Sequence, residues 1–218
     1  MAINRDELLD IAYNLGKLKE QGIDAPRIWG GLLPVSLGEI TVNPQSDPAI
    51  SQFFKYDPKA AKALLDQAGG GFTTSMQYPK TLGAEYVTIA ETLPKYWGDI
   101  GVKVDLEVVD YASGFVPKTL RGDFPGLGMA GYSGIPDPGA FLESAASSTS
   151  PTNQSKINDP KVDDYLKRYS SELDATKRKA ILVEMQKYML PLMYYIPSQW
   201  GAALSITAYQ PNVRGPRE

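Results

Sequence analysis

The sequence contains neither cysteine nor histidine. The lack of cysteine excludes disulfides, thiolate metal sites and cysteine nucleophiles, and it leaves the redox environment open. The lack of histidine removes the commonest general base near neutral pH and the commonest transition-metal ligand. Serine triads and imidazole metal sites are therefore excluded, and no group of residues suggests carboxylate or lysine chemistry. We expect a protein without catalytic residues, cofactor or metal.

Long apolar runs and an excess of one charge are missing as well. No apolar run approaches the length that a membrane span requires, so no transmembrane segment is expected. With 22 basic and 25 acidic residues, the net charge is −3, and no basic stripe is available for a phosphate backbone. Nucleic acid is therefore not an expected partner. The N-terminal segment MAINRDELLD lacks the basic start and apolar core of a secretory signal.

The composition is otherwise that of an ordinary globular protein. The chain of 218 residues is 43% hydrophobic and 22% charged, which fits one large domain or two small ones. A domain of this size buries roughly 70% of the surface of its unfolded chain. A substantial core is therefore expected.

Several helices are predicted from caps and apolar spacing. Asn4 can cap the first helix, and Asp57 with Pro58 at the first helical position can start another. Apolar residues at helical spacing predict further helices over 89–100, 115–120, 162–169 and 181–189. Between 16 and 55 the pattern gives way to proline, glycine and isolated apolar residues. So long a connection is usually functional or wraps a surface.

Alternating apolar residues predict strands over 72–78 and 102–108, and a third strand is expected near 127–130. A strand, a long helix and a second strand favour a crossover with parallel pairing. The fold class is therefore α/β, with a mixed and mainly parallel sheet flanked by helices.

The segment GYSGIPDPGAFL, residues 131–142, packs three glycines and two prolines directly after the third predicted strand. Such a composition fits an ordinary turn. However, open α/β layers bind ligands at the carboxyl ends of their strands, which is where this segment is expected. Asp137 precedes a proline and is interpreted as a helix cap rather than a ligand contact.

Seven segments in the same order resemble one family: AINRDELL, YDPKAAKALLDQAG, WGDIGVKVDLEVVDY, LRGDF, GYSGIPDPGAFL, NDPKVDDYLKR and the helix leading to LMYYIPSQW. Together they are similar to the family 5 extracellular solute-binding proteins of ABC importers, which include dipeptide, oligopeptide and nickel binders. The resemblance covers nearly the whole chain. It implies a type II periplasmic-binding-protein fold, in which two lobes close on a ligand between them.

The resemblance also implies what the chain works with. Residues 1–218 are expected to form a single lobe, the second of the two, with the first lobe and the signal peptide absent from this sequence. The implied partners are that missing first lobe, a small-molecule or peptide solute and the permease of an ABC transporter. The implied location is periplasmic or extracellular.

The candidate ligand-binding residues follow from the same resemblance. In relatives, the turn after the third strand carries an Asp that pairs with the amino terminus of a peptide. Here Tyr132, Ser133, Gly134 and Ile135 occupy the equivalent space, so the amine-binding carboxylate is missing. Its loss argues against ordinary free-amine dipeptides and leaves a saccharide, an opine-like compound or a longer peptide as alternatives.

Three aromatic residues are weighed beside this turn. Trp29 and Trp200 could stack on a planar group, although a lone tryptophan is more often part of a core. Tyr111, just after the second strand, is a similar candidate. The alternative function is a stand-alone α/β regulatory or enzymatic domain. The missing histidine, the missing cysteine and the lack of a glycine-rich phosphate loop argue against an enzyme.

Overall fold

The computed structural model describes residues 1–25, 27, 28, 30–33, 35–130, 137–198, 201 and 202. Its elements in chain order are α1 (Arg5–Tyr13), α2 (Leu15–Glu20), β1 (Arg27–Ile28), the 3₁₀ segment η1 (Val35–Ile40), α3 (Pro48–Phe54), α4 (Pro58–Gln67), β2 (Thr73–Tyr78), η2 (Lys80–Leu82), α5 (Ala84–Gly98), β3 (Lys103–Val108), the π-helical turn η3 (Tyr111–Phe115), η4 (Thr119–Arg121), β4 (Leu127–Gly128), α6 (Pro138–Ala146), α7 (Pro160–Ser171), α8 (Ala175–Leu192) and β5 (Gly201–Ala202). Among these, no helix is both long and apolar enough to cross a membrane.

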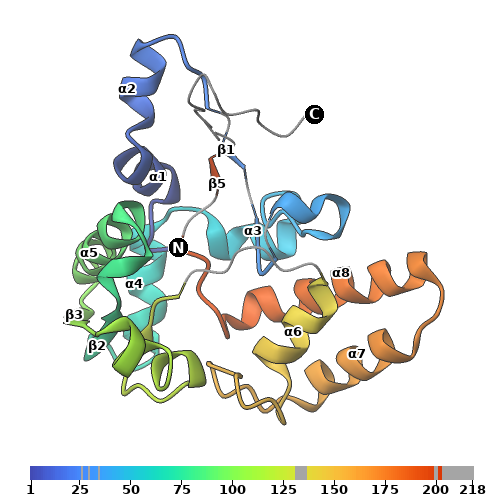
Figure 1. Ribbon diagram of the computed structural model, residues 1–218. Helices are drawn as coiled ribbons and strands as arrows, with labels where there is room; N and C mark the ends of the chain where they lie inside the picture. Colours follow the sequence, from blue (N-terminus) through green and yellow to red (C-terminus); the bar gives the residue numbers. More distant parts are fainter. Residues whose placement is uncertain (26, 29, 34, 131–136, 199–200, 203–218) are drawn as a thin grey trace, which may run out of the picture.

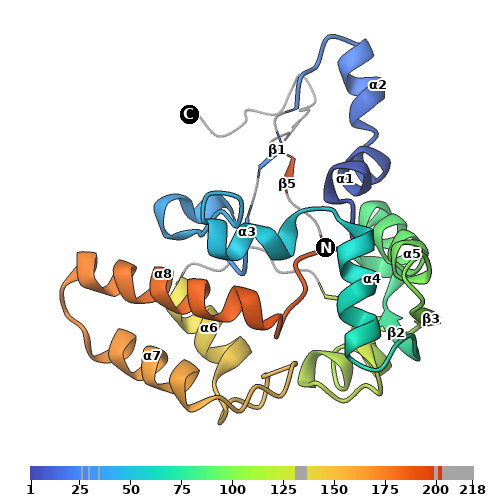
Figure 2. The same ribbon diagram turned by 180° about the vertical axis from the view of Figure 1, so that it is seen from behind.

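The described chain forms two units: a sheet unit of β2, β3 and β4 with α4 and α5, and a helical unit of α6, α7 and α8. In Figure 1 the strands β2 and β3 lie with α4 and α5 on one side, and α6, α7 and α8 lie on the other. Figure 2 shows the same division from behind, with α3 above α8 and the long α8 running alongside α7. The two units meet below α3, and this meeting place forms the site described below.

The sheet has the strand order β3-β2-β4, with both pairings parallel. The prediction of a parallel crossover through α5 is therefore confirmed. Because the three strands run in the same direction, their carboxyl ends lie at one edge of the sheet, where Ala130 leaves β4. A separate antiparallel pair joins β1 to β5.

One face of the sheet packs on α5. Met76 and Tyr78 of β2 are buried against Ile89 and Leu93 of α5 in one apolar cluster. The strand predicted over 102–108 forms, but its apolar residues are buried only at its start. Val102 and Val104 pack in apolar clusters with Trp97 of α5, whereas Leu106 and Val108 are exposed on β3, an edge strand of this sheet.

Aspartates followed by proline start four of the helices. The side chain of Asp57 accepts a hydrogen bond from the Ala60 N–H at 2.9 Å, which confirms the predicted cap of α4. Asp137 caps α6 as expected, and Asp47 and Asp159 cap α3 and α7 in the same way. The helix α3 was missed because its short run, PAISQFF, lies in a region without extended helical periodicity.

The helical unit has its own core. As predicted, α7 and α8 bury apolar residues at helical spacing, and they pack against α6 and against Leu33 and Ile40 of the long connection. The buried positions are Val162, Leu166, Tyr169, Ile181, Met185 and Met189. Helix α7 packs against both α6 and α8. The helical pattern of these segments was therefore a sound guide to their packing.

The long connection over 16–55 carries α2, β1, η1 and α3, of which η1 and α3 pack on α8. Its anchor is Gln186 of α8, whose side chain is fully buried. The Gln186 amide donates to the Ile40 carbonyl at 2.7 Å and accepts from the Val42 N–H at 3.3 Å. A buried amide that satisfies two backbone groups of another segment fixes that segment in place.

Candidate functional site

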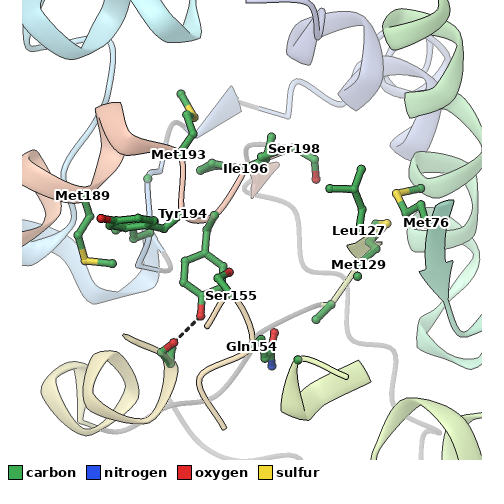
Figure 3. A pocket seen from close by; sticks show the side chains of 18 of the residues that line it. Met76, Leu127, Met129, Gln154, Ser155, Met189, Met193, Tyr194, Ile196 and Ser198 are labelled. Carbon is green, nitrogen blue, oxygen red and sulfur yellow. Dashed lines mark hydrogen bonds between the residues drawn. The ribbon is translucent and has the colours of Figure 1, made fainter. Parts of the chain in front are cut away.

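A cavity of about 710 Å³ lies between the sheet unit and the C-terminal end of α8. Figure 3 shows its walls, and the labelled residues form three groups: Met76, Leu127 and Met129 from the sheet unit; Met189, Met193, Tyr194, Ile196 and Ser198 from the end of α8 and the segment after it; and Gln154 and Ser155 from the loop between α6 and α7. Its volume falls within the range of small-molecule sites, about 300–1,000 Å³.

Glycines bring the sheet wall of the cavity close to β2. A Cβ atom at Gly126 would lie 2.4 Å from the Ser75 carbonyl oxygen, and one at Gly128 would lie 3.0 Å from the Phe124 ring. The sequence GLGM therefore lets β4 approach its neighbour while Leu127 and Met129 line the cavity. A larger residue at position 126 would push β4 away from the sheet.

The floor of the cavity joins the two units. Gly122 adopts a left-handed conformation, with φ of 72°, and a Cβ there would lie 2.4 Å from the Gln154 carbonyl oxygen. The Lys156 ammonium donates to the Arg121 carbonyl. Asn153 is buried and binds the Ile157 carbonyl at 2.7 Å. Residues 144–155, SAASSTSPTNQS, have the composition of a solvated loop, yet Asn153 within them is buried and the Gln154 backbone lies against Gly122.

The wall opposite the sheet begins where α8 ends, at Met193 in the left-handed conformation. The Tyr194 hydroxyl donates to the Asp159 carboxylate at 2.9 Å, and the Tyr195 hydroxyl donates to the Ala145 carbonyl. The Arg5 guanidinium donates to the Pro197 carbonyl at 2.8 Å. The segment is thus held at three points while Tyr194, Tyr195 and Pro197 line the cavity.

Asp159 combines several hydrogen bonds outside the cavity. Its carboxylate caps α7 and also accepts from the Tyr188 hydroxyl at 2.8 Å. Burial alone would raise the pKa of Asp159, but the hydrogen bonds from Tyr188, the Lys161 N–H and Tyr194 bring that pKa below its usual value. The hydrogen bond to Asp159 raises the pKa of Tyr188 to about 12 and also raises the pKa of Tyr194. Both hydroxyls are therefore protonated donors at neutral pH.

The lining is rich in methionine and aromatic rings. Four of the six methionines of the chain line the cavity, namely Met76, Met129, Met189 and Met193. The aromatic lining residues are Tyr86, Trp97, Phe124, Phe141, Tyr194 and Tyr195. Of the described lining residues, Lys156 alone carries a charge, and its ammonium is bonded to a backbone carbonyl. The arrangement can hold an apolar group, and it offers no acid or base for catalysis among the described lining residues.

Six of the seven predicted site residues lie outside the described residues: Trp29, Tyr132, Ser133, Gly134, Ile135 and Trp200. Their described neighbours along the chain are nevertheless informative. Gly30, Ala130 and Ser198 all line the cavity. The three stretches singled out in the sequence therefore adjoin one site along the chain, although they are far apart in the sequence.

Tyr111 and Asp137 are described and lie elsewhere. Tyr111 is exposed at the start of η3, stacks on Phe115 with 5.7 Å between ring centroids, and is not among the lining residues.

Asp137 accepts from the Gly139 N–H at 2.8 Å and from the Tyr169 hydroxyl at 3.1 Å. The hydrogen bond from the Ala140 N–H is the main cause that lowers the pKa of Asp137. The interpretation of Asp137 as a cap is confirmed.

Comparison with known proteins gives the family. The model of the bacterial extracellular solute-binding proteins, family 5, matches residues 1–153. The chain belongs to this family. A curated relative is the dipeptide-binding protein of Escherichia coli K12, which is 25% identical over 196 residues, or 86% of this chain. The chain spans about a third of the length of that relative, 34%.

Solved structures of family members share the fold. A DppA periplasmic binding protein from Helicobacter pylori, in complex with the peptide STSA, is 23% identical and has a TM-score of 0.68 over 92% of this chain and 37% of its own. AgaA from A. tumefaciens R10, in complex with agropinic acid, is 24% identical and has a TM-score of 0.68 over 88% of this chain and 37% of its own. The predicted type II periplasmic-binding fold, with a small parallel sheet flanked by helices, is confirmed. The family is a transport family rather than an enzyme family.

Sequence reasoning missed most of the cavity. The four methionines lie in β2, after β4, and at the end of α8, so no spacing along the chain brings them together. The segment YYIPS, residues 194–198, was noticed as part of a family match but not as a wall. The signal that could have found it is the pair of tyrosines directly after a helix that ends near a proline.

Proposed function

We propose that this chain is one lobe of the solute-binding component of an ABC importer and supplies one wall of its ligand cleft. The observation that carries the proposal is the cavity of about 710 Å³, whose lining residues adjoin the predicted stretches at Trp29, at 131–136 and at Trp200. Concave, mostly apolar sites with a few polar groups are typical of small-molecule binding. Family membership supports the same function.

The proposed mechanism is closure on a solute. Residues 1–218 act as a single lobe that contains this cavity, and a first lobe that is not part of this sequence covers it from the other side of the cleft. A solute that bridges the lobes favours the closed state only through its higher affinity for that state. The permease of the importer then recognises the closed receptor in the periplasm or at the outer cell surface. The candidate solutes are peptides, saccharides and opine-like compounds.

The test is to identify what copurifies with the receptor that carries this chain and its opposite lobe. Native mass spectrometry of the gently purified receptor should show an added mass of solute size, which denaturation releases and tandem mass spectrometry identifies. Unfolding and refolding in the absence of solute should remove the added mass, and adding back the identified compound should restore it. A receptor that never carries or takes up a solute would contradict the proposal.

A further inference from the structure

We infer that the cavity selects solutes that carry bulky apolar groups, of the size of a leucine or phenylalanine side chain, rather than sugars or small polar compounds. The inference rests on the proposed function, because it names the chemical class of solute for the same site. Its test uses this chain alone, so that it can fail independently. Three features of the lining carry it.

The first feature is the orientation of the polar groups on the α8 side. The hydroxyls of Tyr194 and Tyr195 are both used within the protein, by Asp159 and by the Ala145 carbonyl. These two residues therefore line the cavity as rings rather than as hydrogen-bond donors to a ligand. A sugar that entered would lose hydrogen bonds to water without regaining them from these two hydroxyls.

The second feature is charge. Among the described lining residues there is no carboxylate, and Lys156 is the one charged residue, with its ammonium on the Arg121 carbonyl. A free amine buried here would have no carboxylate partner in the described lining, which is costly. The described polar side chains are few: Tyr86, Gln154, Ser155, Lys156, Tyr194, Tyr195 and Ser198. Because Tyr194, Tyr195 and Lys156 of this set bond within the protein, the set cannot replace the hydration of a polyol.

The third feature is the set of methionines on facing walls. Met76 and Met129 belong to the sheet unit, and Met189 and Met193 belong to the end of α8. Methionine side chains are flexible and polarisable, so they adapt to apolar groups of different shape and make favourable contacts with aromatic rings. The cavity should therefore accept both branched aliphatic and aromatic groups, and it should discriminate by polarity more than by shape.

The methionines also provide the measurement. In the chain labelled at the methionine methyl carbons, Met129 and Met193 are partly exposed and report on the cavity directly, Met76 and Met189 are buried just behind its surface, and Met1 and Met185 do not line it and serve as internal references. We expect titration with Gly-Leu-Gly or Gly-Phe-Gly, with acetylated and amidated ends as in all the tripeptide probes, to shift Met129 and Met193 most and to leave the two references in place. The apparent affinity for Gly-Ser-Gly and for maltose should be weaker by about tenfold or more, because these compounds bury little apolar surface.

Matched variants localise the effect. Ile196 lines the cavity and is 45% exposed, whereas Leu192 is 46% exposed and is not a described lining residue. Ile196→Glu should weaken binding of Gly-Phe-Gly by about tenfold or more, since the charge would have to be buried with the peptide. Leu192→Glu should change it by less than about twofold, because exposed substitutions away from a site have small effects.

The outcomes separate the two proposals. Equal affinity for apolar and polar probes, or shifts that survive Ile196→Glu, would overturn the selectivity for apolar groups even if the complete receptor binds a solute. Cavity shifts that depend on protein concentration without any peptide would mean that a second copy fills the cavity, and would also overturn it. If this chain shows selective shifts but the receptor with both lobes never carries a solute, the selectivity stands and the transport function is contradicted.

Discussion

Replacing Gly139 by alanine should lower the free energy of unfolding by about 1–3 kcal/mol, the usual range for an overpacked site. A Cβ atom at this position in α6 would lie 1.8 Å from the Tyr169 ring. That ring cannot move without loss, because its hydroxyl binds Asp137 at 3.1 Å and the Arg178 guanidinium lies 4.5 Å from its centroid. Thermal and denaturant unfolding followed by circular dichroism measure the change.

The sign of this change is informative, because alanine normally stabilises a helix by about 1 kcal/mol relative to glycine. Gly16 in α2 is the matched control, since a Cβ there would meet nothing within 4 Å. Gly16→Ala should therefore be neutral or stabilising. A Gly139→Ala protein as stable as the wild type would show that the packing of α6 on α7 is looser than described.

Replacing Arg5 by methionine should cost about 1.5–3 kcal/mol of stability, the range for hydrogen bonds to a charged group. Arg5 is 4% exposed, and its guanidinium donates to the Pro197 carbonyl at 2.8 Å and to the Phe54 carbonyl at 3.3 Å. Burial lowers the pKa of Arg5 to about 10, so the side chain remains charged at neutral pH. The substitution would leave two backbone acceptors without this donor.

The same substitution should also affect the cavity, because Pro197 lies in its wall. We expect the signal of Met193, near the start of that wall, to shift in the methyl spectrum of Arg5→Met, while Met185 in the core of the helical unit keeps its position.

Arg27→Met is the control for the loss of stability. Arg27 is partly exposed and pairs with Asp10, and such surface pairs contribute about 0–1 kcal/mol. Equal losses in the two variants would contradict the role given to Arg5.

Local signals explain how much of the fold was predictable. Asn4, Asp57 and Asp137 each act through a side chain and a backbone group two or three positions away, so the sequence contains all that is needed to predict these caps. The alternation over 102–108 predicted a strand correctly. It could not show that Leu106 would be exposed, because that depends on which strand pairs with which.

The site was predictable only in outline. The prediction of a ligand-binding segment at 131–136 rests on a strand end and glycines that are visible in the sequence, and it stays a prediction because these residues lie outside the described ones. The wall after α8 depends on contacts between residues that lie far apart in the sequence, such as Arg5 and Pro197. No local pattern predicts such contacts. The polar composition of residues 144–155 also gave no sign that Asn153 would be buried. Its side-chain amide can be buried because it bonds to both the carbonyl and the N–H of Ile157.

Isothermal titration calorimetry compares the isolated chain directly with the complete receptor. With the solute that copurifies with the receptor, we predict that this chain alone binds at millimolar concentration or more weakly, because half of the contacts are missing and no closed state can form. The receptor with both lobes should bind the same solute far more tightly. Micromolar affinity from this chain alone would contradict the account of one lobe that supplies one wall.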